Sequence, residues 1–287
     1  MRLFGALALV LVAFAGNSVL NRLALVSDGA IGALEFAMIR VLAGALTLVV
    51  LVRLRDRGRE WQRHAPTSRE LAAAGALALY LLGFSLAYLS LPAGLGALIL
   101  FGGVQVTMFA GAVLGGEAVP PARWLGAAVA FGGLVYLLWP GGAGAPDLIG
   151  ALLMIAAALG WGVYSLIGRG SQDPLADTAR NFLFAILPVG ALMFAFAASD
   201  GGGAVPLRGA VLGVVSGAVT SGLGYALWYA VLPQLKPSVA AVAQLTVPLI
   251  AMAGGMVFLA EPLTLRFALA SVIVLGGVAY AVLAQRA

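Results

Sequence analysis

The feature that most constrains this chain is the length of its uncharged intervals. An ionised group in the middle of a lipid bilayer costs several kcal/mol, and about 20 apolar residues are enough for one helix to cross it. The sequence therefore predicts seven membrane-spanning helices from its uncharged intervals of about one span each. These intervals are 3–21, 124–146, 148–168, 181–199, 209–235, 237–260 and 267–285.

Two further segments bring the predicted number to ten. The uncharged interval 71–116 has 46 residues. It would make a straight helix of about 69 Å, roughly twice the thickness of the hydrocarbon core. We expect it to fold back at Ser90-Leu91-Pro92. Residues 32–52 form a tenth span, which is apolar apart from Glu35 and Arg40. With 62% hydrophobic and 9% charged residues, the chain is expected to be an all-α integral membrane protein with ten transmembrane helices.

The positive charges lie mostly on one predicted side of the membrane. Twelve of the 16 Lys and Arg residues fall in the two termini and in alternate loops, whereas only Arg22, Arg208 and Arg266 fall on the other side. Cytoplasmic loops carry the excess of Lys and Arg. We therefore expect a multi-pass protein of the bacterial cytoplasmic (inner) membrane with cytoplasmic N- and C-termini. The alternative for Met1–Ser18 is a cleaved signal peptide.

The second half of the sequence repeats features of the first at a spacing of 144 residues. Gly132–Tyr136 reads Gly-Gly-Leu-Val-Tyr and Gly276–Tyr280 reads Gly-Gly-Val-Ala-Tyr, while Glu117 corresponds to Glu261. We therefore divide the chain into two five-helix repeats, residues 1–140 and 141–287. Because five is odd, the second repeat enters the membrane from the opposite side. Such inverted repeats around a central cavity are typical of secondary transporters.

These features together resemble the drug/metabolite transporter superfamily, EamA family. The resemblance includes the glutamate after the fourth helix and the Gly-Gly-x-x-Tyr of the fifth helix in each repeat. It also includes Leu159–Tyr164, which is similar to the family's Trp-Gly motif. The corresponding Phe14–Ser18 lacks the tryptophan, so we expect no aromatic wall from the first helix. The aromatic third, sixth and eighth helices look most like YddG-like amino-acid exporters. The family implies an export carrier whose cavity is built mainly by helices 1, 3, 4, 6, 8 and 9.

The candidate substrate-binding residues are aromatic or polar side chains within the predicted spans. Tyr80, Phe84 and Tyr88 recur every four residues and so share one helix face. An amphipathic solute needs apolar walls with a few polar groups. The alternatives are core packing or an interfacial belt for the aromatic residues, and bonds between helices for the glutamines. The remaining candidates are Trp161, Tyr164, Tyr225, Gln105, Gln244, Asn17 and Arg40.

Charged residues and a proline give four further expectations. Arg40, about nine residues into its span, could attract a substrate carboxylate, pair with Glu35 or extend to the membrane surface. Apart from Glu35 the spans contain no Asp, Glu or His, so we expect weak or no proton coupling through a buried carboxylate. Glu117 and Glu261 are expected to cap neighbouring helix amino termini, just ahead of the fifth and tenth helices. Pro248 should kink the ninth helix.

The groups that catalysis needs are missing from the predicted spans. The chain has no cysteine, its single histidine, His64, falls in a loop, and no aspartate lies within a span. Gly141–Gly144 lacks the Gly-Lys-Ser/Thr ending of a phosphate-binding loop. We therefore expect no enzyme activity, no catalytic residue, no cofactor and no metal site.

The predicted function is a membrane carrier that exports small amphipathic metabolites, above all neutral or aromatic amino acids, by alternating access. The alternatives are an exporter of organic cations, drugs or other metabolites of the same superfamily, and a passive channel. The expected partners are the small-molecule substrate and the lipid bilayer. We expect no nucleic acid and a monomer.

Overall fold

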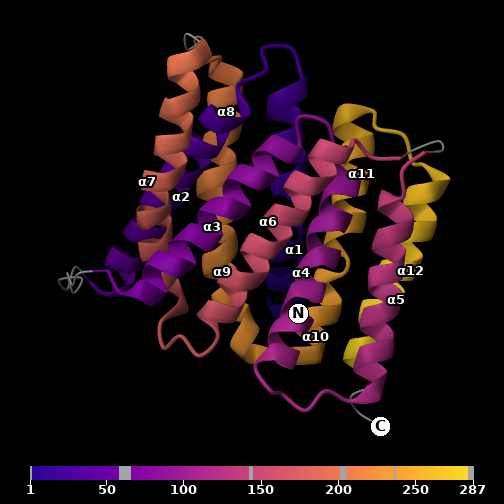
Figure 1. The fold of residues 1–287 in the computed structure, drawn as a ribbon. Helices are drawn as coiled ribbons and strands as arrows, with labels where there is room; N and C mark the ends of the chain where they lie inside the picture. The colour runs from indigo at the N-terminus through magenta and orange to yellow at the C-terminus, as the bar shows by residue number, and fades with distance from the viewer. Residues whose placement is uncertain (1, 58–65, 142–144, 201–204, 236, 284–287) are drawn as a thin grey trace.

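The computed structural model describes residues 2–57, 66–141, 145–200, 205–235 and 237–283, and every regular element in these ranges is helical (Figure 1). Ten helices of these ranges are long and apolar enough to cross a membrane, which confirms the predicted number. His64, most of Gly141–Gly144 and four of the Lys and Arg residues counted above lie outside the described residues.

The helices follow one another through short connections. The first half contains α1 (Arg2–Val26), α2 (Ala33–Arg55), α3 (Ser68–Ala87), α4 (Ala93–Leu114) and α5 (Pro121–Leu138). The second half contains α6 (Leu148–Gly168), α7 (Pro174–Asp200), α8 (Leu207–Val215), α9 (Gly224–Val231), α10 (Pro237–Gln244), α11 (Val247–Leu259) and α12 (Leu265–Leu283). The eighth span is continuous from α8 to α9 through a π-helix at Ser216–Leu223 and ends in a 3-10 turn at Leu232–Gln234.

Two predicted interruptions occur where the sequence places them. The long uncharged interval folds back between Ala87 and Ala93. The ninth span is interrupted at Leu245 and Thr246, and Pro248 stands in the first turn of α11. Proline has no backbone N–H to donate to the preceding turn, so the helix breaks just before it.

Corresponding helices of the two halves pack against each other. Helix α2 packs on α7, α4 on α11 and α5 on α12, and α5 and α12 stand together at one edge of the bundle (Figure 1). Helices α3 and α6 approach closely through glycines, because a Cβ on Gly83 would lie 2.7 Å from the carbonyl oxygen of Leu153. Small residues of this kind let membrane helices pack at short distance.

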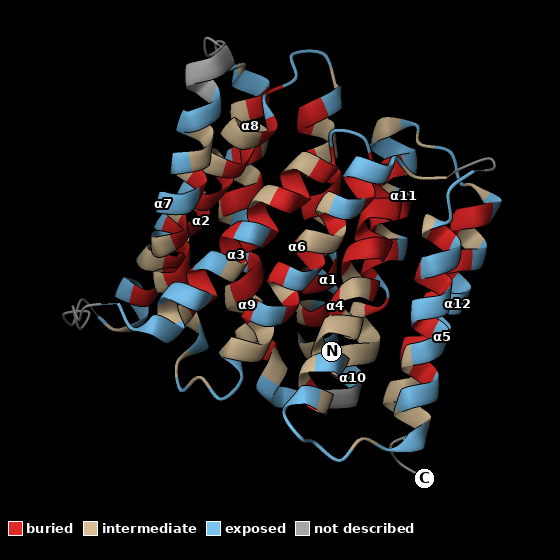
Figure 2. Cartoon of the chain, in the orientation of Figure 1, coloured by how far each residue is buried: buried red, intermediate tan, exposed pale blue. Residues whose placement is uncertain are grey.

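Buried residues face the interior of the bundle, and exposed residues lie mostly on its outside (Figure 2). Large side chains such as Leu46, Phe194, Val257 and Val272 are exposed. Exposed apolar surface of this extent needs a lipid environment, because soluble proteins rarely expose such patches. The fold is therefore that of a multi-pass membrane protein.

Candidate functional site

A cavity of about 760 Å³ lies between helices of both halves. Its lining follows α3 from Thr67 to Phe84, about 25 Å at 1.5 Å per residue. Exposed Arg69 and Arg169 lie at one end, whereas Tyr80 and Phe84 at the other are buried. The cavity therefore opens at the end where α2, α4 and α6 finish and α3, α5 and α7 begin, which we call the Arg55 end. The opposite end, with the α1–α2, α3–α4 and α11–α12 connections, is the Arg22 end.

An aromatic cluster from three helices forms the deep part of the cavity. The Trp161 ring of α6 lies 4.9 Å from Tyr80 of α3, measured between ring centres. It stacks on Tyr225 of α9 at 5.4 Å with an interplanar angle of 19°. Tyr164 lies one turn further along α6, 5.4 Å from Trp161. These rings give the cavity a wall that suits an apolar or aromatic solute.

Helix α1 also contributes an aromatic ring, so the expectation that it supplies none was wrong. Phe14 lines the cavity and lies 5.8 Å from Tyr225 and 5.9 Å from Trp228. The prediction considered only the missing tryptophan. Phe14 reaches the rings of α9 because α1 packs against α9.

Asn17 is the polar centre of the deep cavity wall. Its Oδ1 accepts hydrogen bonds from Ser216 Oγ at 2.9 Å and Thr220 Oγ1 at 2.6 Å, and its Nδ2 donates to the Thr220 carbonyl at 3.3 Å. Both hydroxyl residues belong to the π-helix between α8 and α9. Sequence reasoning missed them, although their spacing of four placed two hydroxyls on one face of an apolar span.

A second polar group lies nearer the open end. The Tyr164 hydroxyl donates to Thr178 Oγ1 at 3.1 Å, and Thr178 Oγ1 lies 2.8 Å from the Tyr229 hydroxyl. All three residues line the cavity. Thr178 belongs to α7, so this group joins the wall formed by α6 and α7 to the wall formed by α9.

Arg40 lies behind the deep aromatic wall and is fully buried. Its Nη2 donates to the Tyr80 hydroxyl at 2.9 Å and its Nε donates to Ser221 Oγ at 3.2 Å. The guanidinium carbon lies 4.9 Å from the centre of the Phe84 ring, at the distance of a cation–π contact. Arg40 forms no ion pair with Glu35 and does not reach the surface, so neither of these two expected roles is seen.

Seven of the ten predicted substrate-binding residues line this cavity: Asn17, Tyr80, Phe84, Trp161, Tyr164, Tyr225 and Gln244. Arg40, Tyr88 and Gln105 do not line it. Tyr88 is buried at the Arg22 end, where its hydroxyl donates to the Ala93 carbonyl at 3.2 Å. Tyr88 follows Tyr80 and Phe84 at the same spacing of four residues, but α3 ends at Ala87, so Tyr88 lies just beyond the helix.

The Arg22 end is closed by a part-buried polar cluster. Arg22 Nε lies 3.4 Å from Glu261 Oε1, and Arg22 Nη1 donates to the carbonyls of Tyr88 and Leu89, each at 2.9 Å. Glu261 Oε2 accepts from the Ala93 backbone N–H at 2.8 Å, so it caps the amino terminus of α4. Glu261 was predicted to cap a helix amino terminus just ahead of the tenth helix, whereas the helix that it caps is α4.

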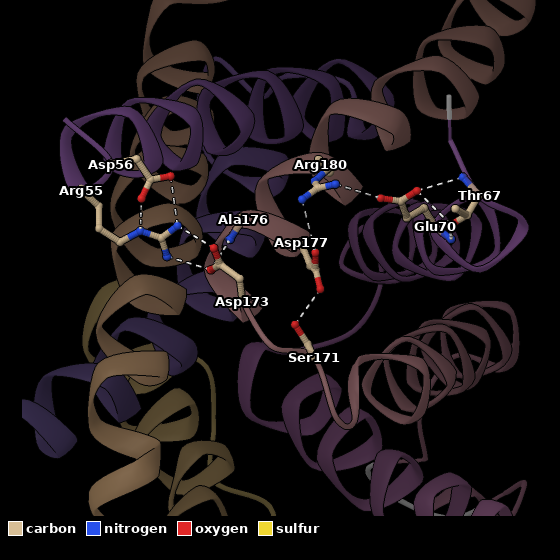
Figure 3. A network of polar contacts seen from close by, with 9 residues as sticks. All are labelled: Arg55, Asp56, Thr67, Glu70, Ser171, Asp173, Ala176, Asp177 and Arg180. Atoms are coloured by element: carbon tan, nitrogen blue, oxygen red, sulfur yellow. Dashed lines mark hydrogen bonds and ion pairs between the residues drawn. The ribbon is translucent and has the colours of Figure 1, made fainter. Parts of the chain in front are cut away.

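Ion pairs at the Arg55 end join α2, α3 and α7 across the protein surface (Figure 3). Arg55 holds the Asp173 carboxylate at 2.6 and 2.7 Å, and Arg180 lies 3.4 Å from Glu70. The hydrogen bond from Arg55 lowers the pKa of Asp173 below its ordinary value of 3.8. Glu117 does not cap a helix there but pairs with Arg169 at 3.1 Å.

Comparison with known proteins identifies the family. A model of the EamA-like transporter family matches residues 148–283. An uncharacterized protein of Pseudomonas aeruginosa is 46% identical over 273 residues, which are 94% of this chain and 91% of the relative. The chain belongs to the EamA-like transporter family. This agrees with the resemblance in the sequence and places the protein among transporters of the drug/metabolite transporter superfamily.

Two further comparisons extend over nearly the whole chain. An uncharacterized transporter of Archaeoglobus fulgidus is 25% identical over 260 residues, 90% of this chain and 89% of the relative. A solved crystal structure covers 97% of both chains with a TM-score of 0.68 and 21% identity, and this likeness concerns the fold alone. In this EamA-like transporter the cavity between the two halves is therefore the candidate substrate site.

Proposed function

We propose that this EamA-like transporter exports small amphipathic metabolites, with neutral and aromatic amino acids as the first candidates, by alternating access across the bacterial cytoplasmic membrane. Both termini and the Arg55 end face the cytoplasm, because the excess of Lys and Arg lies on that side. The structure then corresponds to a monomer that is open to the cytoplasm. YddG-like exporters are the subgroup that the aromatic helices favour.

The observation that carries the proposal is the composition of the cavity wall. Rings from α1, α3, α6 and α9 surround a space of about 760 Å³, within the usual range of small-molecule sites. Asn17 supplies polar contacts deep in the cavity, and the hydroxyls of Thr178 and Tyr229 supply them nearer the open end. A solute with an apolar body and a small polar group matches this arrangement.

In many carriers, access to the cavity alternates between the two sides of the membrane because the protein has two related halves. We propose that residues 1–140 and 141–287 of this chain are such an inverted repeat. The packing supports this, because helices that correspond in the two halves meet each other: α2 with α7, α4 with α11 and α5 with α12. The pairs Arg22–Glu261 and Arg169–Glu117 also correspond. Each joins the end of a half's first helix to the glutamate that follows the fourth span of the other half.

The proposed function is tested with purified protein in proteoliposomes loaded with unlabelled solute. Labelled phenylalanine, leucine, a hexose and an organic cation are offered outside, and counterflow is measured for each. We expect saturable counterflow of the amino acids. Flux that is linear in concentration and insensitive to internal solute would indicate a channel, and preference for the hexose or the cation would contradict the substrate class.

Trp161→Ala removes the ring at the centre of the wall. Because Trp161 contacts Tyr80, Tyr164 and Tyr225, we expect a loss of at least about 10-fold in counterflow of phenylalanine, the equivalent of one strong aromatic contact. Trp124→Ala is the matched control, because Trp124 is half exposed on the outer side of α5. Equal activity of the two variants would remove Trp161 from the site.

A further inference from the structure

We infer that the solute carries a carboxylate, and that Arg40 balances its charge through the hydroxyl of Tyr80 and the amide of Asn17. This inference rests on the proposed function, because it concerns the same cavity, and it adds the charge of the solute. The expected ligand class is a small monocarboxylate with an apolar or aromatic body, with or without an amino group.

The first argument is the unbalanced charge of Arg40. Among the described residues no carboxylate lies within ion-pair distance of its guanidinium, which is fully buried. Its Nη1 has no hydrogen-bond partner. Hydroxyl oxygens and ring faces relieve a buried cation only in part, and a buried charge without a counter-charge is strongly unfavourable. An anion that enters the cavity supplies the missing negative charge.

The second argument is the direction of the hydrogen bonds that lead from Arg40 to the cavity. The Tyr80 oxygen accepts from Arg40 Nη2, so its own hydrogen remains to be donated, and Tyr80 lines the cavity. A hydroxyl that accepts from a cation is polarised and becomes a stronger donor. Tyr80 therefore presents a donor to the cavity with a positive charge directly behind it.

Asn17 ends a parallel chain of hydrogen bonds. Arg40 Nε donates to Ser221 Oγ at 3.2 Å, and Ser221 Oγ donates to Asn17 Oδ1 at 3.4 Å. The Asn17 oxygen accepts two further hydroxyls, whereas its amide uses one N–H for the Thr220 carbonyl and has a second N–H left. Both deep polar groups of the cavity thus have donors to offer, and donors suit an anion.

The inference is tested with three ligands of nearly equal shape: 3-phenylpropanoate, 3-phenylpropanamide and 2-phenylethylamine. They carry a negative, a neutral and a positive group on the same aromatic body. We expect the wild-type protein to prefer the carboxylate about 10- to 100-fold over the amide in competition with labelled phenylalanine, and the amine to compete most weakly. An amine that competes as well as the carboxylate would overturn the inference and leave the transport function standing.

Tyr80→Phe removes the donor but keeps the ring. We expect it to reduce the carboxylate-to-amide preference about 10-fold, with little change for the amide, while Tyr136→Phe on the outer side of α5 leaves the preference unchanged. Arg40→Lys keeps the charge and should retain part of the preference that Arg40→Gln loses. Equal losses for all three ligands in Tyr80→Phe would show a structural role and contradict the inference.

Binding to the purified protein separates this inference from the transport proposal. The same three ligands are added to the protein in detergent, and the shift of the unfolding temperature is measured. Stabilisation by the carboxylate that Tyr80→Phe abolishes supports the anion site even if proteoliposomes show no flux. Flux of amino acids without a preference for the carboxylate in either assay supports the transport proposal alone.

Discussion

At the Arg22 end, one arginine and one glutamate join several helices in a part-buried cluster, whereas at the Arg55 end the corresponding residues lie on the surface. The side chains of Arg22 and Glu261 are 17% and 9% exposed, and they bind the backbone of the α3–α4 connection. The side chains of Arg169 and Glu117 are 43% and 49% exposed. The same pair of residue types therefore closes one end and leaves the other open.

This difference indicates how a carrier built from two similar halves changes state. In the proposed inverted repeat the two pairs are equivalent, and the present conformation covers only Arg22 and Glu261. We therefore expect the opposite conformation to cover Arg169 and Glu117 instead. The exposed pair belongs to the open end, and the part-buried pair belongs to the closed end.

The largest expected difference between the two ends is their accessibility to a water-soluble reagent. The chain has no cysteine, so single cysteines report on one site each. A Cβ on Gly168, at the mouth of the cavity, meets no atom within 4 Å, whereas Leu91 at the Arg22 end is fully buried. We expect an impermeant maleimide to label Gly168→Cys about 100-fold faster than Leu91→Cys.

The labelling is measured in inside-out and right-side-out membrane vesicles. With the Arg55 end in the cytoplasm, Gly168→Cys reacts only in inside-out vesicles. Fast labelling of Gly168→Cys in right-side-out vesicles would reverse the proposed orientation, and similar rates for the two cysteines would contradict closure at the Arg22 end.

The next largest effect is expected from Glu261→Gln. The variant removes the partner of Arg22 and weakens the cap of α4, so we expect the free energy of unfolding to fall by about 2 kcal/mol. Labelling of Leu91→Cys should become faster in the same background. Glu117→Gln is the matched control, with an expected change below about 0.5 kcal/mol because its pair is exposed. Thermal unfolding in detergent measures both, and equal effects would show that the two ends do not differ.

The smallest effect concerns the response of the Arg55 end to pH. Arg55 lowers the pKa of Asp173 in the folded protein, so ionised Asp173 stabilises the fold above pH 3.8, and this contribution is lost as the pH falls below that value. We expect Asp173→Asn to lower the free energy of unfolding by less than about 1 kcal/mol at pH 7, because the pair is partly exposed, and the effect should shrink as the pH falls below 3.8. A difference that does not shrink with falling pH would contradict this origin.

The helices could be predicted from the sequence because a bilayer penalises charge so strongly. The fold-back near Pro92 and the break before Pro248 follow from length and from the missing proline N–H. The π-helix at Ser216–Leu223 could not be predicted. Local propensity contains no signal for it, and the Asn17 side chain that its hydroxyls contact belongs to α1, far away in the chain.

The cavity was harder to predict than the helices. Lipid tails and the protein interior are both apolar, so the hydrophobic pattern of a span does not show which face turns inward. Tyr80, Phe84 and Tyr88 share a sequence spacing, but only the first two line the cavity. The partners of Arg40 come from α3 and the π-helix, far away in the chain, and only the packed structure brings them together.

The one-sided opening of the cavity also shapes the electric field that a solute experiences. Water and ions that reach the depth of Tyr80 carry the potential of one compartment with them, so the membrane voltage falls across the short closed segment near the Arg22 end. One elementary charge moved through 100 mV corresponds to about 2.3 kcal/mol. Most of the electrical work on a net anion is therefore done while it crosses this short segment. A zwitterion has no net charge, so it crosses the same segment with almost no electrical work.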